Sequence, residues 1–139
     1  MYGHLSSLIN NSETIGGSSF GRLFKDCISL IKANRLVLFD DVSVLCYDSL
    51  FANCVNLINT PELPASSLKE YCYESMFYGC ISLEITPDLL SLELAPYCYE
   101  SMFEGCSGLK TITNLPAVEL TDYCYASMFS GCTGLIDLS

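Results

Sequence analysis

Residues 71–80 read YCYESMFYGC, residues 97–106 read YCYESMFEGC, and residues 123–132 read YCYASMFSGC. Each of these copies begins 26 residues after the one before it, at 71, 97 and 123. An earlier copy at 45–54, LCYDSLFANC, keeps the same step, and a shorter one at 19–27, SFGRLFKDC, lies 27 residues before its counterpart. Repetition at a fixed period is typical of architectures in which no single unit can bury a core alone.

Aligning the copies places the same side chains in columns. These columns are Phe24, Phe51, Phe77, Phe103 and Phe129; Leu30, Leu57, Leu83, Leu109 and Leu135; and Cys27, Cys54, Cys80, Cys106 and Cys132. Equivalent positions of stacked units lie about 5 Å apart. We therefore expect each column to form a row through one continuous core.

Within a copy, the apolar residues follow the i, i+4, i+5 spacing of an amphipathic helix, which predicts a short helix over about 68–78. Short strands are expected over 83–86 and 109–112, and the Pro61 and Pro87 column ends the strand because proline cannot donate to a ladder. Residue types that tolerate a left-handed backbone precede the second cysteine of each copy: Asp26, Asn53, Gly79, Gly105 and Gly131.

The motif F-x-G-C-x-x-L occurs at 77–83, 103–109 and 129–135, and Asn53 replaces its glycine in a fourth copy. With this motif the chain resembles the BspA-like leucine-rich repeat family from about residue 19 onward. It departs from the leucine-rich consensus L-x-x-L-x-L-x-x-N, and its repeat is longer than that of the family. The resemblance implies an α/β leucine-rich repeat solenoid of about five 26-residue repeats, with short parallel strands on one side and short helices on the other.

The same resemblance implies a surface protein of Bacteroides-type bacteria, extracellular or at the cell surface, that adheres to a protein or glycan ligand. We divide the chain into an N-terminal segment at 1–18, which is irregular, a partial repeat or a cap, and a repeat domain at 19–139. Because Ser139 follows Leu135 where the next strand is expected, we expect truncation at this end. The alternative function is a spacer or fibre module that self-associates end to end through the open C-terminal end.

Charge limits the possible partners. The formal net charge is −10, and from residue 36 onward only Lys69 and Lys110 oppose fourteen acidic residues. Binding of nucleic acid through a basic patch is therefore not expected, whereas a cationic partner or a simply solvated acidic surface fits. No apolar run reaches the roughly 18 residues of a membrane-spanning helix, and the first residues lack the pattern of a signal peptide.

The chain has nine cysteines, which from Cys46 onward alternate in steps of eight and eighteen, as in Cys72, Cys80 and Cys98; this differs from the C-x₂₋₄-C pairs of zinc sites. We expect buried free thiols and no metal or cofactor. The only histidine, His4, lies in the N-terminal segment, so we predict no catalytic residues and no enzymatic activity.

Two further columns bear on function. Carboxylates align at Asp48, Glu74 and Glu100, followed by Ala126, which indicates a solvated face or, alternatively, a cation site. Tyr71, Tyr97 and Tyr123 fall on the polar side of each copy, whereas the column of Tyr47, Tyr73, Tyr99 and Tyr125 falls on the apolar side. The outer three are our candidate partner-binding residues, because exposed tyrosine offers rigid amphipathic contact area; the alternative is that they only stack and shield.

Overall fold

The computed structural model describes residues 2–4 and 20–135. Its strands β1 (Tyr2–His4) and β2 (Arg35–Val37) pair in parallel, with Gly3 opposite Leu36. Leu36 is the buried residue of β2 and joins the core. Residues 2–4, which include His4, are therefore paired with β2 and not irregular, in agreement with the alternative of a partial repeat or cap; residues 1 and 5–18 lie outside the described part.

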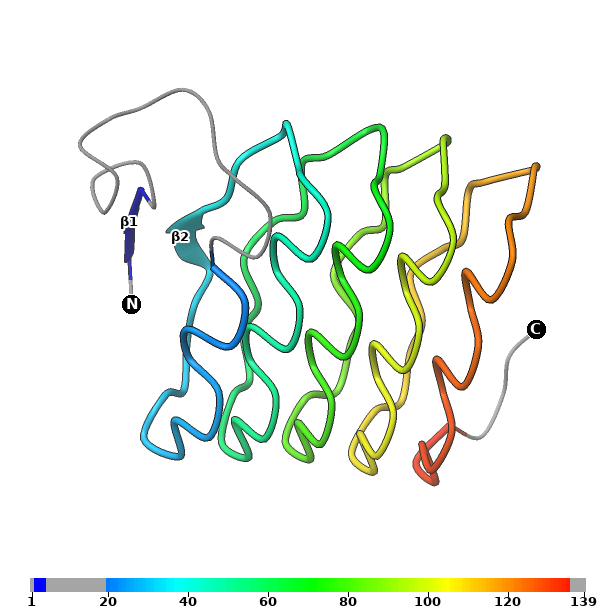
Figure 1. The fold of residues 1–139 in the computed structure, drawn as a ribbon. Coiled ribbons are helices and arrows are strands. Elements are labelled where there is room, and N and C mark those ends of the chain that lie inside the picture. Colours follow the sequence, from blue (N-terminus) through cyan, green and yellow to red (C-terminus); the bar gives the residue numbers. More distant parts are fainter. Residues whose placement is uncertain (1, 5–19, 136–139) are drawn as a thin grey trace.

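From residue 20 onward the chain winds into successive turns that stack side by side (Figure 1). We call each turn a coil, and each coil corresponds to one copy of the repeat. Backbone bonds join neighbouring coils: the N–H of Tyr73 donates to the Cys98 carbonyl at 3.0 Å, and the N–H of Tyr99 donates to the Cys124 carbonyl at 3.0 Å. Residues one repeat apart in sequence thereby become neighbours in space.

The helix predicted over 68–78 is wrong, because this part of the coil is a run of tight turns. Tyr71, Ser75 and Gly79 have φ angles of 57°, 51° and 72°. An α-helix needs φ near −63° at every residue, so a left-handed residue at every fourth position prevents it. We call residues 69–80, and their equivalents in the other coils, the turn segment; within 2–4 and 20–135 there is no helix, hence none able to span a membrane.

Two kinds of backbone hydrogen bond alternate along the turn segment. The N–H groups of Cys72 and Glu74 donate to carbonyls three residues back, at 3.2 Å each, while the N–H of Ser75 donates to Glu100 of the next coil at 2.9 Å. The left-handed residues Tyr71, Ser75 and Gly79 all donate to the next coil. A left-handed non-glycine residue costs about 1–2 kcal/mol, which the inter-coil bonds and the packing between coils offset.

The left-handed residues expected before the second cysteine are confirmed. Their φ angles are 62° at Asp26, 59° at Asn53, 72° at Gly79, 77° at Gly105 and 73° at Gly131. They end the turn segment rather than a helix.

The strands expected over 83–86 and 109–112 reduce to single parallel bridges. Ile85 is bridged to Thr111, and the other isolated bridges are Lys32–Asn59, Leu63–Leu89 and Ser67–Glu93. Side chains take over some of the bonding between coils, since the hydroxyl of Ser82 donates to the Val55 carbonyl at 2.7 Å. The prediction of four-residue strands is therefore wrong, because each segment forms only a single parallel bridge.

The predicted row of phenylalanines is confirmed. From Phe24 to Phe129 the ring centroids of neighbouring coils lie 5.6, 5.5, 5.6 and 5.8 Å apart, with nearly parallel planes. Beside this row lie the fully buried Leu57, Leu83 and Leu109. Each coil therefore completes the core of its neighbours.

The cysteines occupy two positions in this core. All nine are free thiols; eight are buried, as expected, and Cys27 is partly exposed. Thiols of the second column donate to phenylalanine carbonyls of the preceding coil, as Cys80 does to Phe51 at 3.2 Å and Cys106 does to Phe77 at 3.0 Å. Burial raises the pKa of Cys106 to about 12, so its thiol stays protonated at neutral pH.

Candidate partner-binding surface

Tyr71, Tyr97 and Tyr123, the candidate binding residues, form one stacked row on the outside of the coils. We call this row the tyrosine ladder. The ring centroids of Tyr71 and Tyr97 are 4.7 Å apart, and those of Tyr97 and Tyr123 are 5.1 Å apart, with interplanar angles of 9° and 7°. Tyr71 and Tyr97 are partly exposed, and Tyr123 is 62% exposed. The structure thus brings all three together at the surface.

The tyrosines of the other column point inward, as the sequence predicts. Tyr47, Tyr73 and Tyr99 are buried, and Tyr125 is partly buried against the core. The two columns differ because residue 71 and its equivalents take the first left-handed position of the turn segment, whereas residue 73 and its equivalents face the core two residues later.

Stacking determines which part of each tyrosine a partner can reach. A ring whose neighbour is parallel and about 5 Å away has that face covered, so Tyr97 is covered on both faces. The ladder therefore presents ring edges and phenolic hydroxyls, and its most exposed ring is Tyr123 at one end. The hydroxyls both donate and accept hydrogen bonds, which makes the surface suited to polar recognition.

Carboxylates lie beside the ladder: the N–H of Glu74 donates to the Tyr71 carbonyl at 3.2 Å, and the N–H of Glu100 donates to the Tyr97 carbonyl at 3.2 Å. Desolvation raises the pKa of Tyr71, with further contributions from Tyr97 and from the charges of Glu74, Glu100 and Glu70. A carboxylate raises the pKa of a phenol through its charge only when the two groups lie near each other. The tyrosine ladder and these acidic side chains thus form one surface.

The aligned carboxylates Asp48, Glu74 and Glu100 repel one another; we call them the carboxylate row. Desolvation raises the pKa of Glu74, the charges of Asp48 and Glu100 raise it further, and Arg22 lowers it. Among residues 2–4 and 20–135 there is no group of three or more His, Cys, Asp or Glu side chains suited to a metal ion.

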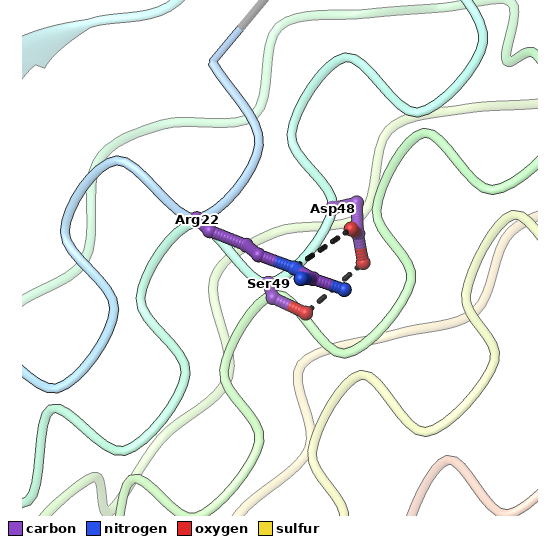
Figure 2. Close-up of polar contacts among 3 residues, drawn as sticks. All are labelled: Arg22, Asp48 and Ser49. Carbon is purple, nitrogen blue, oxygen red and sulfur yellow. Dashed lines mark hydrogen bonds and ion pairs between the residues drawn. The ribbon is translucent and has the colours of Figure 1, made fainter. Parts of the chain in front are cut away.

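One end of the carboxylate row has a cationic partner from the chain itself. The Nε of Arg22 lies 3.6 Å from Oδ2 of Asp48, and the hydroxyl of Ser49 donates to Oδ1 of Asp48 at 3.0 Å (Figure 2). Arg22 belongs to the first described coil and Asp48 to the next, so the ion pair bridges two coils. A guanidinium is therefore accommodated beside this row.

Two grooves that we did not predict lie elsewhere on the coils. One, of about 550 Å³, is lined by residues 34–40 with Glu62 and Pro64; the other, of about 490 Å³, is lined by 60–64, 86–88 and Leu90. Neither groove is lined by histidine or cysteine. The only sequence signal for the second groove is a repeated Thr-Pro-acid-Leu motif at 60–63 and 86–89.

Sequence analysis also missed a set of exposed isoleucines. Ile28, Ile31, Ile58, Ile81 and Ile85 are each at least half exposed. Ile31 and Ile58 are direct neighbours, since the N–H of Ile58 donates to the Ile31 carbonyl at 2.8 Å.

Comparison of the chain with protein-family models, with curated proteins and with solved structures finds no match.

Proposed function

We propose that this chain is a non-enzymatic, leucine-rich-repeat-type solenoid module of a bacterial surface, which binds a protein or glycan through the tyrosine ladder. The observation that carries the proposal is the stacked, exposed row of Tyr71, Tyr97 and Tyr123. The extracellular or cell-surface location and the adhesive role follow from the resemblance of the F-x-G-C-x-x-L motifs to Bacteroides-type surface proteins.

Rigidity of the ladder supports this proposal. The N–H of Tyr71 donates to the Pro96 carbonyl at 3.4 Å, and the N–H of Tyr97 donates to the Asp122 carbonyl at 3.1 Å. Backbone bonds between coils thus hold the tyrosines in place, and stacking restricts their rings. A preorganised surface loses little conformational entropy when a partner binds.

The ladder is tested by replacing Tyr71, Tyr97 and Tyr123 together with serine. We expect at least about a tenfold loss of affinity, because the removal of aromatic contact residues often costs more than about 1.4 kcal/mol of binding free energy. The measurement is binding of the purified chain to printed glycans and to immobilised purified proteins of differing charge. Circular dichroism and thermal unfolding establish that the triple variant remains folded.

Tyr78→Ser is the matched control. Tyr78 lies in the same turn segment and is 40% exposed, but its ring is not part of the ladder. The control should bind as the unaltered chain does. Equal binding by the unaltered chain and the triple variant excludes the ladder, and failure of the unaltered chain to bind any probe contradicts the binding function.

An alternative function, end-to-end stacking on another copy or domain, is favoured by the last described coil. Leu115 and Leu120 are 41% and 66% exposed, whereas the equivalent Leu63 and Leu68 are 3% and 4% exposed. Apolar side chains at core positions of the repeat are thus uncovered within residues 20–135.

A further inference from the structure

The carboxylate row contains more negative charge than the chain neutralises locally. Arg22 lowers the pKa of Glu74, yet its guanidinium lies beside Asp48, one coil away. Glu74 and Glu100 are partly buried, so water screens their mutual repulsion less than it does on an open surface. A cation placed against this pair relieves the repulsion.

The same two carboxylates border the tyrosine ladder, since the N–H of Glu74 donates to the Tyr71 carbonyl at 3.2 Å and the N–H of Glu100 donates to the Tyr97 carbonyl at 3.2 Å. Both charges also raise the pKa of Tyr71. The combined surface therefore offers carboxylate oxygens, which only accept hydrogen bonds, together with phenolic oxygens. A neutral sugar gains no charge pairing here, and an anionic partner is repelled. The surface favours a ligand that is positively charged and rich in donors.

The contact of Arg22 with Asp48 indicates which cation fits (Figure 2). A guanidinium carries five N–H donors in a planar fork, and it is less strongly hydrated than an ammonium group. Neighbouring coils bring equivalent ladder rings to 4.7 Å, so one fork can reach acceptors of two coils at once. Lysine has a compact charge and lacks this geometry.

We propose that the surface formed by Tyr71, Tyr97, Glu74 and Glu100 binds an arginine-rich segment of a protein partner. This inference rests on the proposed function, because it names the chemistry of the partner that the tyrosine ladder takes. The guanidinium groups pair with Glu74 and Glu100, while the stems of the arginine side chains lie along the edges of the tyrosine rings.

A fluorescent oligo-arginine peptide tests the proposal by anisotropy at near-physiological salt. The unaltered chain should bind it, and Glu74→Gln/Glu100→Gln should bind at least about tenfold more weakly, the equivalent of 1.4 kcal/mol. The matched control is Glu93→Gln/Glu119→Gln, which changes the net charge equally but removes two exposed carboxylates that are not among those that raise the pKa of Tyr71. It should lose less than about threefold.

Equal losses in the two double variants overturn the proposal, because they indicate attraction to overall charge alone. No binding by the unaltered chain also overturns it, and so does equal affinity for oligo-arginine and oligo-lysine of the same length. A different outcome distinguishes this proposal from the proposed function. If the peptide does not bind but the serine triple variant still loses a protein or glycan probe, only the arginine-rich partner is rejected.

Discussion

At the scale of single residues, the inward tyrosines differ in whether their hydroxyls have a partner. The hydroxyl of Tyr99 bonds to Ser91, whose own hydroxyl donates to the Ala65 carbonyl at 2.6 Å. One coil earlier, alanine replaces this serine, and the buried hydroxyl of Tyr73 has no hydrogen-bond partner. A buried unpaired hydroxyl costs about 1–3 kcal/mol.

This difference predicts opposite responses to the same substitution. Tyr99→Phe should lower the free energy of unfolding by about 1 kcal/mol, because it breaks the bond to Ser91. Tyr73→Phe should leave it unchanged or raise it, because it removes an unpaired polar group. Urea denaturation of both variants measures the difference, and a larger loss for Tyr73→Phe contradicts the pairing described here.

At the scale of the turn segment and its neighbouring loop, glycines are required for two separate reasons. Gly105 has a left-handed φ of 77°, but a Cβ there meets its nearest neighbour at an ordinary 3.7 Å. Gly108 has no left-handed φ, but its Cβ would lie 2.2 Å from the backbone carbonyl oxygen of Ile81 in the adjacent coil. Glycine is required at 105 by the left-handed backbone conformation, and at 108 by the close approach of the adjacent coil.

Gly108→Ala should therefore destabilise the chain more than Gly105→Ala does. We expect a loss of about 1–2 kcal/mol for Gly105→Ala, from the left-handed backbone. For Gly108→Ala we expect more than about 3 kcal/mol, because the backbone of one coil must move away from the other. Chemical denaturation of the two variants tests this order, and a milder effect at Gly108 would show that the coils separate easily.

At the scale of the whole molecule, the stack exposes an apolar surface on its last described coil. Leu120 is 66% exposed, although its equivalents Leu68 and Leu94 are buried or partly buried. Joining this surface to the opposite end of another copy is a heterologous contact, which extends into a series rather than closing into a dimer. The alternative function requires such a contact.

This alternative predicts association that rises with protein concentration and is lost in Leu120→Glu. The control is Leu92→Glu, which places the same charge at a residue 63% exposed in the preceding coil, outside the core columns. Sedimentation velocity over a concentration series measures the effect. A monomer at all concentrations, or equal loss of association in both variants, contradicts end-to-end stacking.

Much of this arrangement was accessible from the sequence because a repeat fixes its own neighbours. The 26-residue step places Phe77 beside Phe103 and Tyr71 beside Tyr97, and the side chains of one column share one environment. The buried cysteines and the division of the tyrosines into inner and outer columns follow from the same alignment. The alignment of the repeats predicts these features without any knowledge of the backbone conformation between them.

The backbone itself was decided by tertiary contacts. Four-residue turns bury Cys72, Tyr73, Met76 and Phe77 with the same spacing as a helix, so the sequence pattern cannot distinguish the two. The next coil accepts the N–H groups that a helix would use within itself, and this stabilises left-handed residues that isolated chains avoid. The ion pair of Arg22 with Asp48 and the unpaired hydroxyl of Tyr73 likewise depend on how two coils meet, which no single copy encodes.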